Sequence, residues 1–268
     1  MKLICCPGAV VNYTPIVRGM DVWTRGLVLG WPSELRFFET RTQLLRELQE
    51  RHLLTAFLFE NERVGAKLGP HVNAEVTSRS VSVDIGSPAL DTSHVAEALG
   101  IVLAHLRPGR VRLVMAQTQV LNEISLDYDE ARGRLASALT GQWVAAGASG
   151  TDCAILLDGK STRTESAFQV HFGVVNKDEV GPRLQRLVGN MPTTTDHATV
   201  VDLGGLPECA IFLDWHWMPG KNLESGDIAA EALIMLDEIV AESLRLSEGI
   251  QDRAGLGRGT VGITEATN

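Results

Sequence analysis

The chain has 268 residues, enough for one large domain or for two small ones that share a core. Its content of 44% hydrophobic and 21% charged residues is typical of a globular protein and argues against extended disorder. The net charge of −9, with no cluster of Lys and Arg, argues against nucleic acid as a partner. The charge is compatible with a basic protein partner or with a simple role in solubility.

The four cysteines do not have the spacing of a disulfide framework or of a CxxC motif, and they predict reduced thiols in a cytoplasmic protein: Cys5, Cys6, Cys153 and Cys209. The N-terminal run MKLICCPGAVV is too short and too interrupted for a secretory signal, and it predicts a first β-strand. No run of 18 apolar residues occurs, so we expect no membrane span.

The first 40 residues are predicted to be irregular after that strand, because Gly and Pro interrupt short apolar segments. A helix is predicted from Thr40 to about His52, since Thr40 and Gln43 have the spacing of a capping box. Residues 53–85 then alternate with a period of two, which predicts strands. The apolar positions change parity near residues 77–80, so a bulge or tight turn is expected there.

The middle of the chain alternates between helical and extended patterns. A helix is predicted with Asp91 as its N-cap and an end near Leu106, followed by a strand over 111–124 and a helix over 128–146. The glycine-rich residues 147–150 indicate a joint between two halves.

The second half is predicted to contain four strands, at residues 151–158, 166–175, 198–203 and 208–217. Asn176 and Glu179 have capping spacing, but Pro182 favours a helix that begins near Gly181. The strongest helical pattern is at residues 227–247, with an apolar stripe along one face.

These elements predict an α+β fold of mainly antiparallel twisted sheets in two similar halves, covered by helices, with a long C-terminal helix. The N-terminal half is residues 1–148, the C-terminal half is residues 149–248, and residues 249–268 are expected to form a flexible tail. The similar order of elements in the two halves suggests an internal duplication.

Four segments resemble a sporadically distributed family of uncharacterised bacterial proteins that are built from two α+β halves and closed by a long helix. They are LNEISLDYDEARGRL, HFGVVNKDEVGPRL, AIFLDWHWMP and DIAAEALIMLDEIVAESL. The resemblance implies the fold, and it brings no activity and no functional residues.

Motifs for common cofactors and hydrolytic chemistry are absent or incomplete. AILLDGKS ends like a phosphate-binding loop, but Ala154 replaces the required first glycine, and a hairpin turn at Asp158 and Gly159 is predicted instead. The glycines at 255, 257 and 259 do not follow a predicted strand, so no dinucleotide site is expected. GxSxG and HExxH do not occur, and we expect no cofactor.

The strand predicted at 208–217 carries the most chemically suggestive side chains. Alternation places Asp214 and His216 on one face, and His171 occupies the corresponding face of the strand predicted at 166–175. If the strands pair, these three residues form a catalytic acid–base site, or His171 and His216 bind a metal. Trp215 and Trp217 on the opposite face are predicted to be buried core residues, with an exposed interface anchor as the alternative.

The absence of a dense catalytic signature favours a non-enzymatic protein-binding or assembly component, such as an accessory or immunity-like protein. We expect a protein partner or a homo-oligomer, and no nucleic acid or membrane. The alternative is a small-molecule enzyme with an acid–base or metal site between the sheet and the C-terminal helix.

Overall fold

The computed structural model describes residues 20–69, 72–86, 92–140, 154–179, 207–224 and 226–256. The strands of this part of the chain are β1 (Met20–Gly30), β2 (Ala56–Phe59), β3 (Arg63–Gly69), β4 (Val72–Thr77), β5 (Ser80–Gly86), β6 (Val111–Glu123), β7 (Ala154–Lys160), β8 (Ala167–Asn176), β9 (Cys209–Met218) and β10 (Lys221–Leu223). The long helices are α1 (Arg36–Glu50), α2 (Ser93–Leu106), α3 (Tyr128–Thr140) and α6 (Ile228–Arg253).

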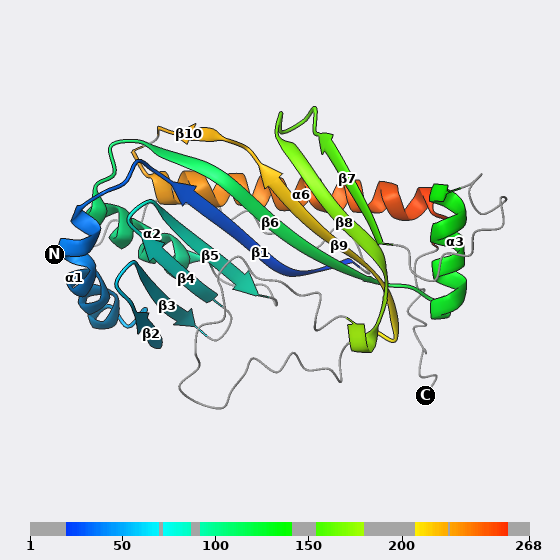
Figure 1. The fold of residues 1–268 in the computed structure, drawn as a ribbon, viewed down its shortest axis with the longest axis horizontal. Coiled ribbons are helices and arrows are strands. Elements are labelled where there is room, and N and C mark those ends of the chain that lie inside the picture. The colour runs from blue at the N-terminus through cyan, green and yellow to red at the C-terminus, as the bar shows by residue number, and fades with distance from the viewer. Residues whose placement is uncertain are drawn as a thin grey trace, which may run out of the picture.

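The strands form one antiparallel sheet in the order β2-β3-β4-β5-β1-β6-β9-β8-β7, with β10 paired to β6 (Figure 1). The predicted fold class, an α+β protein with a large antiparallel sheet and a long C-terminal helix, is confirmed. Strands β1 to β5 lie together on one side of the sheet, and β6 to β9 lie on the other. Internal duplication stays a prediction.

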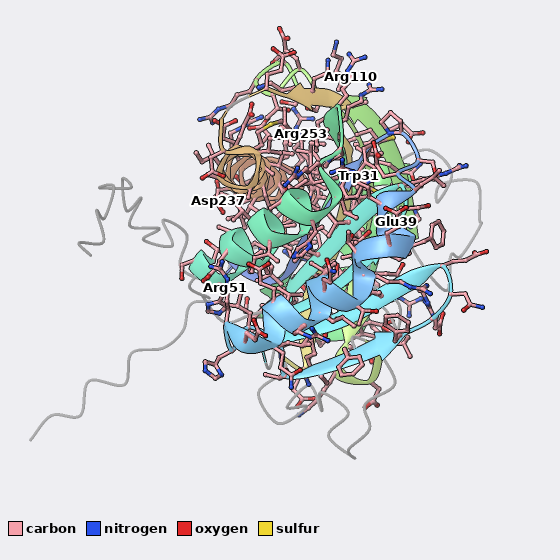
Figure 2. The ribbon with its side chains drawn as sticks, turned by 90° about the vertical axis from the view of Figure 1, so that its left-hand side faces the viewer. Trp31, Glu39, Arg51, Arg110, Asp237 and Arg253 are labelled. Atoms are coloured by element: carbon pink, nitrogen blue, oxygen red, sulfur yellow. The ribbon has the colours of Figure 1, made fainter. Side chains whose placement is uncertain are left out.

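Helices α1, α2 and α6 cover one face of the sheet, and α2 contacts both of the others (Figure 2). The sequence dictates this arrangement because the apolar residues of the strands alternate. Val72, Ala74 and Val76 pair with Ile85, Val83 and Val81 in turn, and all six are buried. The predicted parity switch is therefore confirmed as the tight turn at Ser78 and Arg79, which joins β4 to β5.

Helix α6 begins where the sequence predicts, because the Asp227 carboxylate accepts a hydrogen bond of 3.0 Å from the Ala230 amide. The helix continues past residue 247 to Arg253, and Ala254 and Leu256 are buried after it. A flexible tail that begins at residue 249 is therefore wrong for residues 249–256. None of the helices in the described ranges is both long enough and apolar enough to cross a membrane.

The prediction of irregular structure in the first 40 residues is wrong for residues 20–30 and 36–40. Strand β1 pairs there with both β5 and β6 at the middle of the sheet, and its glycines do not interrupt the pairing. Helix α1 also begins earlier than predicted, at Arg36. Thr40 does not cap it, because its Oγ1 donates a 2.8 Å hydrogen bond to the Arg36 carbonyl inside the first turn.

The hairpin between β7 and β8 turns later than predicted. Asp158 and Gly159 lie within β7, opposite Gln169 and Phe168, and the turn occupies residues 161–166. A Cβ added to Gly159 would lie 2.4 Å from Cζ of Phe168, so the glycine serves close packing across the strand pair rather than the turn.

Asn176 caps the helical turn formed by residues 177–179. Its Oδ1 accepts hydrogen bonds from the amides of Asp178 and Glu179, and Glu179 Oε2 accepts one from the Asn176 amide. This is the reciprocal capping box that the spacing suggests, and the helix start predicted near Gly181 lies outside the described residues.

Several predicted features lie outside the described residues. They are the first strand within residues 1–11, Asp91 as an N-cap, the end of the helix after residue 140, the joint at 147–150, the strand at 198–203 and the glycines at 257 and 259.

Candidate functional site

The structure brings together the three polar residues that the sequence singles out. Strands β8 and β9 pair with His171 opposite Asp214 and with Gln169 opposite His216. Asp214 Oδ2 lies 3.1 Å from His216 Nε2, and the imidazole rings of His171 and His216 are 6.3 Å apart. The two-residue spacing on β9 therefore produces a direct carboxylate–imidazole pair.

Strand β6 supplies a residue that the sequence analysis does not single out. Gln117 lies opposite His216, and its Nε2 donates a 2.8 Å hydrogen bond to Asp214 Oδ1. Both Gln117 and Asp214 are buried, whereas His216 is half-buried and His171 is exposed. The Asp214 carboxylate is thus held on one oxygen by Gln117 and on the other by His216, which orients the imidazole as a carboxylate does in an acid–base pair. The alternation of apolar residues along β6 predicts which side chains share a face. That Gln117 lies beside Asp214 and His216 could be seen only from the pairing register of β6 with β9.

The predicted location of this site between the sheet and α6 is wrong. Trp215 and Trp217 alternate with Asp214 and His216 along β9 and contact α6, so the polar pair lies on the opposite face of the sheet. Within the described ranges no group of three or more His, Cys, Asp or Glu side chains is arranged to hold a metal ion, and metal binding by His171 and His216 stays a prediction.

The Asp214–His216 hydrogen bond raises the pKa of His216 above its ordinary value, although burial acts in the other direction. The stabilising contribution of His216 is therefore present below about pH 6.5 and is lost as the pH rises through the higher pKa of the folded protein. We expect Asp214→Asn to lower the pKa of His216, as followed by the NMR shifts of its ring protons. An unchanged titration in this variant would rule out Asp214 as the cause.

Trp215 and Trp217 are core residues. Both are fully buried beneath α6, where the indole N–H of Trp215 donates to Ser247 Oγ at 3.0 Å and that of Trp217 donates to Ser243 Oγ at 2.9 Å. Phe168 packs against both indoles with ring centroids 5.2 and 5.0 Å away. The alternative role of the two tryptophans as exposed interface anchors is therefore wrong.

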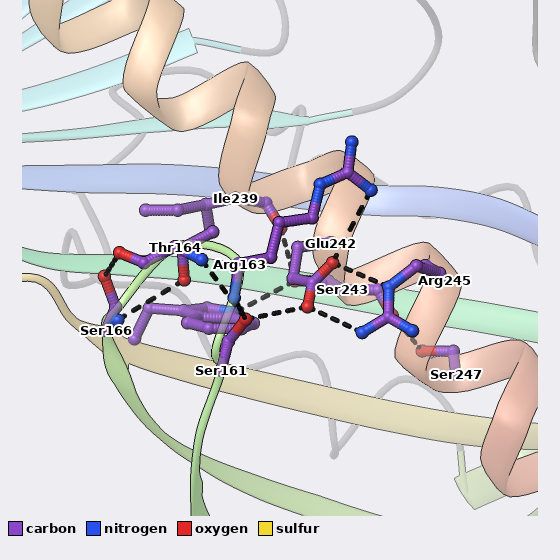
Figure 3. Close-up of polar contacts among 10 residues, drawn as sticks. Ser161, Arg163, Thr164, Ser166, Ile239, Glu242, Ser243, Arg245 and Ser247 are labelled. Carbon is purple, nitrogen blue, oxygen red and sulfur yellow. Dashed lines mark hydrogen bonds and ion pairs between the residues drawn. The ribbon is translucent and has the colours of Figure 1, made fainter.

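The buried carboxylate of Glu242 is a further feature that the sequence analysis missed. The residue is 1% exposed, and Oε1 accepts hydrogen bonds from Ser161 Oγ at 2.8 Å and from Arg245 Nη2 at 2.7 Å (Figure 3). Arg245 Nε also donates to Oε2 at 2.8 Å, and Arg163 Nη1 lies 4.0 Å from it. These contacts, with Arg245 the main one, hold the pKa of Glu242 below its usual value. The cluster anchors the β7–β8 turn to α6.

Exposed apolar residues gather where β2 meets the start of α1, at the edge of the sheet. We call them, together with one arginine, the aromatic surface: Leu35, Phe38, Arg41, Phe57 and Phe59. The guanidinium of Arg41 lies 4.7 Å from the ring centroid of Phe59 and 6.0 Å from that of Phe38, so it connects the helix to the strand. Alternation places Phe57 on the same face of β2 as Phe59.

Arg41 is held in place by the turn after β2. Its Nη1 donates hydrogen bonds to the carbonyls of Glu60 at 3.0 Å and Asn61 at 2.5 Å. These hydrogen bonds orient the guanidinium between the two phenylalanines. Sequence periodicity could not reveal this surface, because Phe57 and Phe59 have the alternation of core residues and only the sheet order shows that β2 is an edge strand.

Comparisons with known proteins do not assign a function to this site. No protein-family model matches the chain, and no curated protein matches it. We therefore infer function from the contacts of the described residues.

Proposed function

We propose that this chain is a non-enzymatic, cytoplasmic protein-binding or assembly component, and that it binds a protein partner through the aromatic surface. The observation that carries the proposal is the exposure of four large apolar side chains, two of which, Phe38 and Phe59, lie against the Arg41 guanidinium. The exposed fractions of Leu35, Phe38, Phe57 and Phe59 lie between 43% and 76%. Aromatic residues, Phe among them, and Arg are enriched at the cores of protein interfaces relative to the rest of the surface.

The hydrogen bonds that hold the Arg41 guanidinium support this interpretation. A side chain that is already ordered loses little conformational entropy when a partner binds, so more of its contact energy contributes to affinity. The net charge of −9 further favours a partner of positive net charge, whose association would slow as ionic strength increases. Nucleic acid is not the proposed partner, since the charge has the same sign as phosphate.

The test uses Phe59→Ser, with Ile234→Ser as the matched control. Ile234 is also a large exposed apolar residue, on α6 rather than in the aromatic surface. A partner retrieved from the native extract by the wild-type chain is purified, and its affinity for each variant is measured by calorimetry. We expect Phe59→Ser to weaken binding by about 30-fold, which is about 2 kcal/mol, and Ile234→Ser to have no effect.

Two results would contradict the proposal. The first is a wild-type chain that retrieves no partner. The second is a partner whose affinity changes equally in Phe59→Ser and Ile234→Ser, because binding would then depend on general surface polarity and not on the aromatic surface.

A second candidate is an acid–base enzyme for a small molecule, favoured by the Asp214–His216 pair. In this case His216 transfers the proton and Asp214, held by Gln117, orients its ring. Binding of a small molecule that shifts the His216 ring resonances, and that fails in His216→Gln, would support an enzyme over a protein-binding component.

A further inference from the structure

Strand β7 ends the sheet on the side away from β2, and its outer edge has no paired strand among the described residues (Figure 1). Two leucines at the centre of β7 are exposed on opposite faces, Leu156 by 53% and Leu157 by 46%. Exposed edge strands of this apolar character pair with other chains unless charges, prolines or bulges protect them. β7 has no proline, and its two charged residues, Asp158 and Lys160, lie at the end near the turn.

The hairpin shows which backbone groups of β7 face outward. The amide of Ser161 donates a 3.0 Å hydrogen bond to the Ser166 carbonyl and closes the β7–β8 turn. Hydrogen-bonded and non-hydrogen-bonded pairs alternate along an antiparallel ladder, so Leu157 and Gly159 direct their amides toward β8. The amides and carbonyls of Leu156 and Asp158 therefore point away from the sheet.

We propose that β7 pairs antiparallel with β7 of a second copy of this chain, about a two-fold axis at Leu156. In this register Leu156 of one copy lies opposite Leu156 of the other, and Ile155 lies opposite Leu157 of the second copy. Asp158 lies opposite Ala154 of the second copy. The exposed apolar side chains thus meet apolar side chains on both faces, and the two sheets become one continuous sheet.

The sequence of β7 favours a second copy and selects this register. Asp158 and Lys160 leave the strand without net charge, so two β7 strands do not repel each other despite the charge of −9 on each chain. A two-fold axis at Asp158 would place two carboxylates directly opposite each other, which is destabilising. An axis at Leu157 would place Leu156 opposite Asp158. Two-fold dimers are the commonest homo-oligomers because one self-complementary patch suffices.

The test measures the mass of the full chain in solution by light scattering, at tens of micromolar protein. We expect the wild-type chain to have twice its monomer mass of 29.0 kDa. Leu156→Lys and Leu156→Glu should each be monomeric, because like charges would meet at the axis. An equimolar mixture of these two variants should restore the dimer, since Lys then meets Glu.

Ile234→Lys is the control and should stay dimeric, because it adds the same charge at an exposed apolar position on α6. Circular dichroism checks that each Leu156 variant is folded. A monomeric wild-type chain, a dimeric Leu156→Lys variant, or a mixture that stays monomeric would each overturn the proposal. The Leu156 variants should still bind the partner of the aromatic surface, so failure of this inference and failure of the proposed function are distinguishable.

Discussion

Replacing Trp217 with Ala is expected to lower the free energy of unfolding by about 4 kcal/mol, the largest effect of any single change considered. The indole is completely buried between the sheet and α6, stacks on Trp215 with ring centroids 5.9 Å apart, and packs against Phe168. Its removal would leave a cavity under the helix and would break the hydrogen bond to Ser243 Oγ. Urea unfolding followed by circular dichroism measures the change.

Met218→Ala is the control, because Met218 is the next residue of β9 and is half-exposed. Its effect should stay within about 0.5 kcal/mol, as for most surface substitutions. Equal effects of the two substitutions would mean that Trp217 does not fasten α6 to the sheet.

Arg245→Ala is expected to destabilise the protein by about 2 kcal/mol at neutral pH, because Glu242 would keep its buried charge with Ser161 as its remaining close partner. The value is below that of a fully buried pair, since Arg245 is half-exposed and solvent screens part of the interaction. Adding Glu242→Gln to Arg245→Ala should recover part of the loss, because it removes the uncompensated charge. Urea unfolding of the three variants measures these changes.

The pH dependence of the same variants gives an independent check. In the wild-type protein the pKa of Glu242 is lowered, chiefly by its hydrogen bonds to Arg245, so its contribution is present above about pH 4.5 and is lost as the pH falls through the lower folded-state pKa. In Arg245→Ala the burial of Glu242 should raise the pKa of its carboxyl group. The difference in free energy of unfolding between this variant and the wild-type protein should therefore become smaller at acidic pH.

Arg134→Ala provides the matched comparison. Arg134 forms a 2.7 Å ion pair with Glu130 on α3, but both side chains are well exposed. We expect Arg134→Ala to lower the free energy of unfolding by less than about 0.5 kcal/mol, with little dependence on pH. A similar loss in Arg134→Ala and Arg245→Ala would show that burial of Glu242 has no special cost.

The sequence predicts most of the fold because the pattern of buried residues is periodic. The parity change between Val76 and Val81 locates the β4–β5 turn, and the stripe on α6 together with Asp227 locates the start of that helix. The prediction fails where the local preference of a residue conflicts with the hydrogen bonds that the sheet provides. Glycines near residue 26 suggest irregular structure, but Gly26 lies within β1, where neighbours on both sides supply the hydrogen bonds.

The candidate site was only partly predictable for a related reason. Spacing along one strand brings Asp214 and His216 together, but Gln117 reaches them from a strand about a hundred residues earlier. The sequence also indicates that the tryptophans face inward, because they share the apolar face of their strand. Indole N–H groups in a core require acceptors. Ser243 and Ser247, the acceptors, continue the helical spacing of Ile239 and could have been recognised from it.

The location of the exposed edges depends entirely on strand order. β2 and β7 have apolar patterns like those of central strands, and only the pairing shows that they end the sheet. Leu156 and Phe57 are exposed for this reason. Single-sequence periodicity detects a strand but not its position in a sheet, so both proposed interaction surfaces emerge from the topology.

Site-specific photo-crosslinking in native cells tests the proposed protein-binding function most directly. A photoreactive phenylalanine analogue replaces Phe57 in the aromatic surface or, for comparison, Ile234 on α6. We predict a discrete crosslinked product containing one other protein from position 57 and none from position 234. No product from position 57, or the same products from both positions, would contradict binding through the aromatic surface.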